Sequence, residues 1–155
     1  MTAKDIMQPD FVCVQPDMPL RQAAELMTEQ RKLLLPVIDA EGCGQGVLME
    51  ADLLRVVLPK YLDGLASLNF LPEACDLFDL NVKIPSLKVQ DVIGQRKLYT
   101  VKPDTKAMEI AHVMLTEQIS SVAVEKDGKI VGIVTRGSLV RHIFEHLLCE
   151  EEQQQ

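Results

Sequence analysis

The sequence predicts an α/β fold in which two β-α-β-β-α repeats pack together about a pseudo-two-fold axis. Two internal matches support this prediction. Residues 12–27, VCVQPDMPLRQAAELM, match residues 98–114, LYTVKPDTKAMEIAHVM, and GVLM at residues 46–49 matches GIVT at residues 132–135. One such unit of about 50 to 60 residues would leave an apolar sheet face uncovered, so we expect the two copies to cover each other.

Each copy contains the same succession of predicted elements. A first strand precedes Pro16 or Pro103, and a helix follows because apolar residues recur at i, i+3, i+4 and i+7. These positions are Leu20, Ala23, Ala24 and Met27 in the first copy and Ala107, Ile110, Ala111 and Met114 in the second. Two strands come next, at residues 33–39 and 46–49 or at 120–126 and 132–135, joined by the turns EGCGQG and Asp127-Gly128. A second helix begins near Asp52 or Ser138.

Length and composition are those of one compact domain, with 155 residues of which 47% are apolar and 25% charged. The four cysteines are scattered without paired spacing and predict free thiols. No apolar run approaches the roughly 20 residues that span a bilayer, and the amino terminus lacks the apolar core of a signal peptide. We therefore expect a cytoplasmic protein without membrane contact. Its net charge of -7 disfavours nucleic acid as a partner.

The repeats divide the chain into four parts. We expect the first repeat at residues 1–58, an apolar segment at 59–88, the second repeat at 89–149 and a disordered acidic tail at 150–155. The apolar segment is longer than most connections in compact domains. Two roles are open for it: a cover for an exposed face of its own module, or a contact with a second subunit or a partner.

The succession of motifs resembles that of a known family. The motifs that carry the resemblance are, in order, KDIM, VxVxPD with a helix, LPVID, a glycine turn and a segment like GVLMEADLL. One repeat resembles a cystathionine beta-synthase (CBS) domain, and the tandem pair resembles a Bateman module. The resemblance covers nearly the whole chain outside the apolar segment and the tail. It implies a stand-alone regulatory module that binds an adenine nucleotide or a related adenosyl ligand between its repeats and associates into a homodimer.

The resemblance also implies two ligand clefts, and this sequence departs from the pattern in both. In the nucleotide-binding form of the family, a Thr or Ser after the second hairpin strand meets phosphate, and an Asp three residues later grips the ribose hydroxyls. Here Thr135 is followed by Ser138, whereas Asp52 is preceded by Met49. Because methionine cannot donate a hydrogen bond and Arg136 can, we expect an anionic ligand in the second cleft.

The candidate ligand-binding residues therefore come from both repeats. For the second cleft they are Thr100, Val101, Ser120, Ser121, Val122, Thr135, Arg136 and Ser138, and for the first they are Cys13, Val14, Leu34, Pro36 and Asp52. A simpler interpretation stays open for several of them. Asp52 and Ser138 are common helix caps, Thr135 favours a strand end, and Arg136 would serve equally as a solvated charge.

The candidate ligands are AMP, ADP, ATP and S-adenosylmethionine, and no cofactor is required. Occupancy would modulate an unknown protein partner. The alternative is a constitutive dimerisation or interaction module whose ligand sites have degenerated, as the divided Thr135 and Asp52 pattern suggests.

No grouping of residues predicts catalysis or a metal site. The sequence offers no adjacent nucleophile, base and orienting acid, and EGCGQG lacks the lysine of a phosphate-binding loop. His142, His146 and Cys149 share one helix face at i, i+4 and i+7, but a structural zinc site needs four ligands. We expect a solvated or dimer-facing helix end there, no metal and no enzyme.

Overall fold

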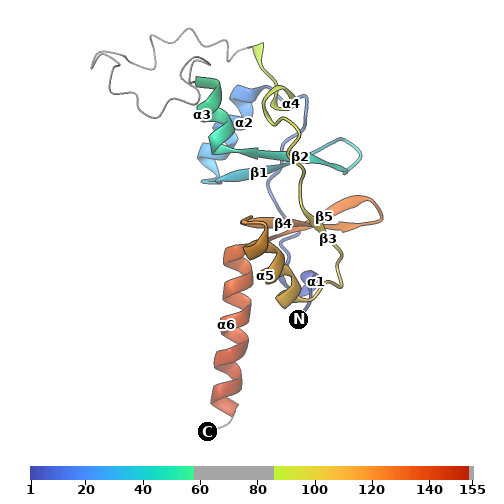
Figure 1. Cartoon of the computed structure of the whole chain (residues 1–155), viewed down its shortest axis with the longest axis vertical. Coiled ribbons are helices and arrows are strands. Elements are labelled where there is room, and N and C mark those ends of the chain that lie inside the picture. Colours follow the sequence, from blue (N-terminus) through green and yellow to red (C-terminus); the bar gives the residue numbers. More distant parts are fainter. Residues whose placement is uncertain (58–85, 154–155) are drawn as a thin grey trace, which may run out of the picture.

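The computed structural model of the chain describes residues 1–57 and 86–153, and two small sheets lie one above the other in it with helices on their outer sides (Figure 1). The upper sheet in that view holds β1 (Leu34–Ile38) and β2 (Gly44–Met49); the lower holds β3 (Thr100–Val101), β4 (Ser121–Lys126) and β5 (Lys129–Thr135). Residues 58–85 are outside the described residues, and with them nearly all of the predicted apolar segment. The α/β fold predicted from the repeats is confirmed.

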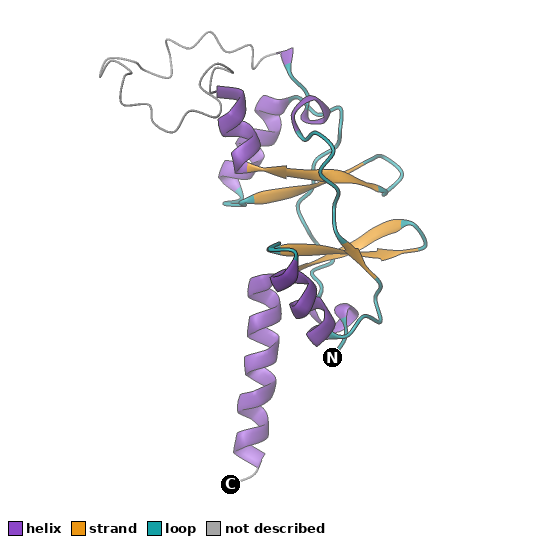
Figure 2. Cartoon of the chain, in the orientation of Figure 1, coloured by secondary structure: helices purple, strands orange, loops and turns teal. Residues whose placement is uncertain are grey.

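The first half consists of the β1–β2 hairpin covered by α2 (Leu20–Glu29) and α3 (Glu50–Val57) (Figure 2). The hairpin is antiparallel, with Leu34 opposite Met49 and Pro36 opposite Val47. The first strand expected in this copy is reduced to a single parallel bridge between Val14 and Val37. Pro16 limits its extension because a proline has no backbone N–H to donate to a neighbouring strand.

The second half repeats this arrangement with α5 (Ala107–Thr116) and α6 (Arg136–Gln153). Here β3 is a true strand of two residues and runs parallel to β4, and β4 pairs with β5 in antiparallel register. Helix α6 includes residues 150–153, which corrects the expectation of a disordered tail for those four residues. Glutamate and glutamine are good helix formers, so a helix that has already begun continues through them.

The short helix at the start of each repeat packs into the opposite half. Helix α1 (Ala3–Ile6) is bonded to the second half, since the N–H of Ala3 donates to the carbonyl of Thr105 at 2.8 Å, and Ala3 and Ile6 are buried with the side chains of α5 and β4. Helix α4 (Val89–Val92) is bonded to the first half through the N–H of Val89 and the carbonyl of Met18 at 3.0 Å. The repeat boundaries in sequence are therefore not the boundaries of the two halves in space.

A cluster of buried apolar residues at the contact between the two sheets joins the halves. Ile38 of the upper sheet lies in it with Ala123, Ile130 and Ile133 of the lower sheet, and Phe11, Cys13 and Leu98 pack around them. A backbone hydrogen bond from Ile130 to the carbonyl of Gly42, 2.8 Å long, adds to this contact. Side chains as fully buried as Ile38 and Ile133 each contribute about 1.5 to 3 kcal/mol on burial, so the halves fold as one unit.

Two glycines allow the exchanged segments to cross the hairpins. A Cβ added at Gly46 on β2 would lie 2.9 Å from the carbonyl oxygen of Arg96 and 3.1 Å from Cδ1 of Ile93, and one added at Gly132 on β5 would lie 2.7 Å from Sδ of Met7. The two glycines are 86 residues apart and begin the matching runs GVLM and GIVT. The repeated glycine is thus explained by close approach of the crossing segment, through the Arg96 backbone at Gly46 and through the Met7 side chain at Gly132.

Replacing Gly46 by alanine should destabilise the chain. The added methyl group meets a backbone carbonyl that cannot rotate away, and overpacking of this kind costs about 1 to 3 kcal/mol. Since each kcal/mol corresponds to roughly 2 to 4 °C in a domain of this size, thermal unfolding should show a midpoint lower by about 3 to 10 °C.

Gly137→Ala provides the matched control. A Cβ at Gly137 would have its nearest neighbour at 3.9 Å, in open space on α6, where alanine favours the helix more than glycine does. Its midpoint should equal or exceed that of the original chain. Equal midpoints for the two alanine variants would contradict the crossing explanation.

Candidate ligand-binding cavity between the halves

A cavity of about 440 Å³ lies where the two halves meet, and we call it the inter-half cavity. One wall comes from the first half, from the segment before α2 and from the α2–β1 connection with the start of β1. The other wall comes from the ends of β4 and β5 and the start of α6. Its lining residues are Gln8, Asp10, Phe11, Val12, Gln30, Arg31, Lys32, Leu33, Leu34, Pro36, Ser120, Ser121, Ile133, Thr135, Arg136 and Gly137.

Four of the residues predicted for the second cleft line this cavity together: Ser120, Ser121, Thr135 and Arg136. Ser121 and Thr135 are direct neighbours across the β4–β5 pair. The Arg136 guanidinium is held beside them, because its Nη2 donates to the carbonyl of Ile119 at 2.9 Å while its backbone N–H donates to the carbonyl of Ser120 at 2.8 Å. Hydroxyl and guanidinium donors therefore gather at one end of the cavity.

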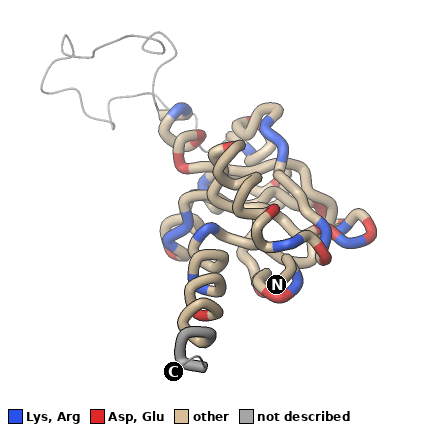
Figure 3. The backbone as a smooth tube through the Cα atoms, turned by 60° about the horizontal axis from the view of Figure 1, so that its bottom comes forward, with Lys and Arg blue, Asp and Glu red and all other residues tan. Residues whose placement is uncertain are grey.

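Two further cations, Arg31 and Lys32, line the same cavity and were not predicted. Arg31 follows α2 with a φ of 51°, in the left-handed region that a side chain other than glycine adopts at a cost. Gln118 has the matching conformation after α5, with a φ of 54°. With Arg136 the cavity has three cationic side chains against one carboxylate, that of Asp10, so it favours an anion. Along the described backbone, lysine and arginine residues are interspersed with aspartate and glutamate (Figure 3).

Most of the apolar side chains that line the cavity come from the first half, with Ile133 added from β5. Leu34 and Pro36, which were predicted for the first cleft, contribute to this lining from β1. Phe11 and Val12 add an aromatic ring and a branched side chain, and neither was predicted: Phe11 precedes the repeated motif, and Val12 is its first residue. A planar ring system would find a stacking surface on Phe11.

Several other predicted residues lie elsewhere. Thr100 and Val101 line a different cavity, of about 650 Å³, beside α5. Val14 and Val122 are fully buried in the cores of the first and second half, respectively. Cys13 is half-buried at the contact between the halves, and burial raises the pKa of its thiol, which disfavours the reactive thiolate.

Ser138 is buried and caps α6 rather than lining the inter-half cavity. Its Oγ donates to the carbonyl of Thr135 at 2.9 Å and accepts from the N–H of Thr135 at 3.1 Å, and Oγ1 of Thr135 accepts from the N–H of Ser138 at 3.1 Å. The capping interpretation of Ser138 thus agrees with the geometry, and Thr135 has both a capping contact and a place on the cavity wall.

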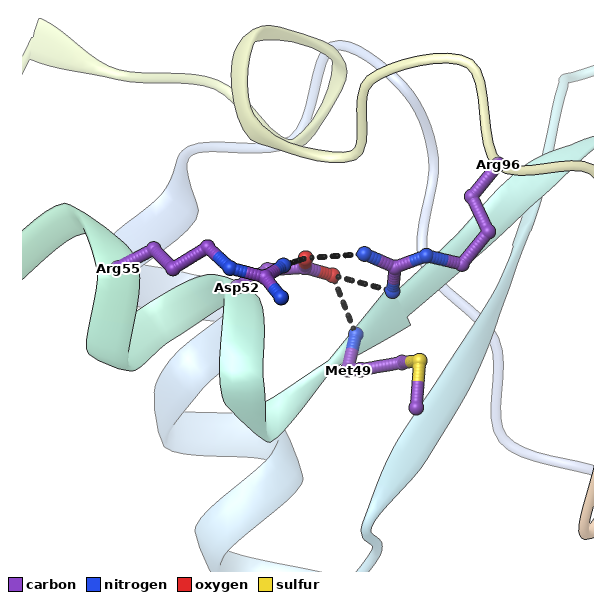
Figure 4. A network of polar contacts seen from close by, with 4 residues as sticks. All are labelled: Met49, Asp52, Arg55 and Arg96. Atoms are coloured by element: carbon purple, nitrogen blue, oxygen red, sulfur yellow. Dashed lines mark hydrogen bonds and ion pairs between the residues drawn. The ribbon is translucent and has the colours of Figure 1, made fainter. Parts of the chain in front are cut away.

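Asp52 occupies the equivalent position at the start of α3, and its side chain is 1% exposed. Its carboxylate accepts hydrogen bonds from the backbone of Met49 and from the guanidinium groups of Arg55 and Arg96 (Figure 4). We call these four residues the Asp52 site. Its donors all belong to the chain itself.

One group of three side chains in the described part of the chain has the spacing of metal ligands: Asp39, Glu41 and Cys43, whose ligand atoms lie within 4.8 Å of one another. The Asp39 carboxylate already accepts from the N–H groups of Glu41 and Cys43 and from Nε2 of Gln45, so it shapes the β1–β2 turn.

The imidazole of His142 is hydrogen-bonded to the carbonyl of Ser138 at 2.8 Å. In residues 1–57 and 86–153, the helices are too short or too polar to cross a membrane.

Comparison with known proteins identifies relatives along most of the chain. An uncharacterized protein of Methanocaldococcus jannaschii, MJ1426, is 30% identical over 93% of this chain and 92% of its own length. A CBS domain-containing protein from Kribbella flavida has a similar structure, with a TM-score of 0.78 and 26% identity over 93% of this chain and 99% of that one. The structure of CBSX2 from Arabidopsis thaliana in complex with AMP gives a TM-score of 0.69 and 27% identity over 93% and 96% of the two chains.

The match to a family model covers both repeats. The CBS domain model fits residues 3–59 and again residues 89–145, in the order in which the motifs recur in the sequence. With the stacked sheets and the duplicated hairpin–helix units, this confirms the predicted family: the chain belongs to the CBS domain family as a tandem pair.

Proposed function

We propose that the chain is a regulatory module that senses an adenine nucleotide, or a related adenosyl ligand, in the inter-half cavity. The observation that carries this proposal is the mixed lining of the cavity, in which the aromatic ring of Phe11 and the side chain of Leu34 occur together with the hydroxyl of Thr135 and the guanidinium of Arg136. A nucleotide likewise combines a planar base with a phosphate. The volume of about 440 Å³ falls within the range of small-molecule sites, roughly 300 to 1,000 Å³.

A structural relative supports the choice of ligand. CBSX2, which is 27% identical to this chain in the aligned region, was solved in complex with AMP. We therefore take AMP as the first probe, and ADP, ATP and S-adenosylmethionine as its competitors. The three cations beside a single carboxylate favour the phosphorylated members of this set.

The position of the cavity suggests how occupancy would be transmitted. Phe11 and Leu34 belong to the first half, whereas Ser121 and Arg136 belong to the second, so one ligand would contact both. A ligand that bridges two packed units favours the arrangement in which both sets of contacts are made. In our proposal the bound arrangement differs in its affinity for a partner protein, which makes the module a switch.

Binding rather than catalysis fits the chemistry of the cavity. Its lining, within the described residues, includes neither histidine nor cysteine, and its carboxylate is that of Asp10. General acid–base or nucleophilic chemistry would require a reactive group held by a second orienting group. The hydroxyl of Thr135 is instead engaged with the backbone of α6.

Replacing Arg31 by glycine tests the proposal. In thermal unfolding, AMP at 100 times its dissociation constant should stabilise the original chain by about 2.7 kcal/mol, a rise of about 5 to 10 °C. Arg31→Gly removes one cation and should cost about 1.5 to 3 kcal/mol of binding free energy, which is a tenfold or greater loss of affinity. Without ligand the variant should be at least as stable as the original, because glycine suits the left-handed backbone.

Gln118→Gly is the control for the backbone effect. Gln118 has the same conformation at the equivalent place in the second half but does not line the inter-half cavity. Its variant should keep the full AMP response. No midpoint rise in the original chain with any of the four ligands would contradict the proposed function, and an equal response of the two glycine variants would contradict the position of the site.

Helix α6 favours a second function, the dimerisation predicted from the family resemblance. The helix extends away from the sheets (Figure 1), and it exposes Val140, Phe144, Leu147 and Leu148 at i, i+4, i+7 and i+8. Apolar side chains at this spacing form one stripe along a helix. We propose that the stripe packs against the α6 stripe of a second copy, since an identical stripe is self-complementary about a two-fold axis.

Placing glutamate at both Phe144 and Leu148 should abolish this association. Each carboxylate would have to be buried without a partner in the helix pair, so the mass in light scattering should fall from that of a dimer to that of a monomer. Glu145→Gln, on the same helix but outside the stripe, should leave the dimer intact. A monomeric original chain would contradict the dimer, and a persistent dimer in the double variant would place its interface elsewhere.

A further inference from the structure

The Asp52 site is saturated by the chain itself. Oδ1 of Asp52 accepts from Nη2 of Arg96 at 2.7 Å and from Nη1 of Arg55 at 3.3 Å, while Oδ2 accepts from the N–H of Met49 at 2.8 Å and from Nη1 of Arg96 at 3.1 Å. Both oxygens of a side chain that is 1% exposed therefore have two donors each. Figure 4 shows the two guanidinium groups approaching the carboxylate from opposite sides.

The two arginines are not equivalent. Arg96 makes two parallel hydrogen bonds, the geometry in which a guanidinium binds a carboxylate most strongly, and its side chain is 35% exposed. Arg55 makes one longer contact and is 66% exposed, so water screens it. Arg96 is thus the main partner of Asp52, although 44 residues separate them in sequence.

Arg96 reaches Asp52 because its backbone crosses β2. The crossing segment, residues 93–99, begins at Ile93 in the core of the first half and passes Gly46, where a Cβ would lie 2.9 Å from the Arg96 carbonyl oxygen. It ends at Tyr99, whose carbonyl accepts from the N–H of Ala123 on β4 at 2.8 Å. Arg96, which forms the ion pair, is therefore the middle residue of the crossing segment that joins the two sheets.

In the second half, the residues that correspond to Asp52 and Arg96 do not form an ion pair. The spacing of 86 residues that relates Gly46 to Gly132 also relates Asp52 to Ser138 and Arg96 to Asp10. Asp10 lines the inter-half cavity, and the Ser138 hydroxyl accepts from the N–H and donates to the carbonyl of Thr135, the residue before α6. Where the first repeat crosses β5, Asp10 therefore lies on a cavity wall. Where the second repeat crosses β2, Arg96 donates to the buried carboxylate of Asp52.

We propose that the Asp52 site is a guanidinium-binding site that the chain fills with its own Arg96, and that this contact locks the crossing segment to the first half. The occupied site needs no external ligand. The lock also holds Leu98, which follows Arg96, in the apolar cluster between the sheets. The Asp52 site lies in the first half and does not line the inter-half cavity, so the lock does not depend on nucleotide binding there.

Removing the guanidinium tests the lock. Arg96→Ala leaves a buried carboxylate without its main partner, so the unfolding midpoint should fall by about 5 °C or more, and peptides covering residues 93–101 and 121–124 should exchange amide hydrogens faster. Asp52→Asn should also destabilise the chain, and the loss in the double variant should be smaller than the sum of the two single losses. Arg55→Ala, the matched control on the same carboxylate, should change the midpoint by about 1 °C or less.

Chemical rescue tests the guanidinium site itself. Millimolar ethylguanidinium should raise the midpoint of Arg96→Ala more than that of the original chain or of Arg55→Ala, whereas ethylammonium, which cannot form the two-bond fork, should not. If Arg96→Ala does not fold, Arg96→Lys provides the same comparison, with an intermediate midpoint expected. A midpoint for Arg96→Ala or Arg96→Lys equal to the original, additive single and double losses, or no selective rescue would each overturn the proposal.

Discussion

The fold depends on an exchange of leading segments between the two repeats. Ile6 of α1 is buried in the core of the second half, and Val89 of α4 in the core of the first, so neither repeat has a complete core of its own. The crossing segments must also pass close over the hairpins, where Gly46 leaves room for the Arg96 carbonyl and Gly132 for the Met7 side chain. The exchange places side chains from both repeats in the core of each half.

The two crossings differ in the polar side chains that they carry. Where the first repeat crosses β5, its polar and aromatic side chains, Asp10 and Phe11, remain beside a cavity with Thr135 and Arg136 on the far wall. Where the second repeat crosses β2, the Arg96 guanidinium donates two hydrogen bonds to the Asp52 carboxylate. A duplicated fold thus has one position arranged to receive an anion and one already supplied with a cation. Sequence divergence at a few crossing positions therefore gives the two equivalent positions different polar partners.

The repeats, the helices and the hairpins were predictable because hydrophobic periodicity and turn residues are local signals. Ser120, Ser121, Thr135 and Arg136 were predictable for the same reason, since each lies at a strand end within one repeated motif. Arg31, Lys32 and Phe11 were not, because they come from the opposite half, and periodicity does not reveal which half a segment crosses. The pairing of Arg96 with Asp52 spans a segment outside both repeats and depends on the glycine crossing, so no spacing in the sequence indicates it.

We propose that the inter-half cavity receives a ligand, whereas the Asp52 site is filled by Arg96. Calorimetric titration of the purified chain with AMP distinguishes the two sites, because the number of equivalents bound is independent of affinity and of any partner. We expect one equivalent of AMP per chain. Two equivalents would show that the Asp52 site is open despite Arg96, and no binding of AMP or of its competitors would remove the sensing role.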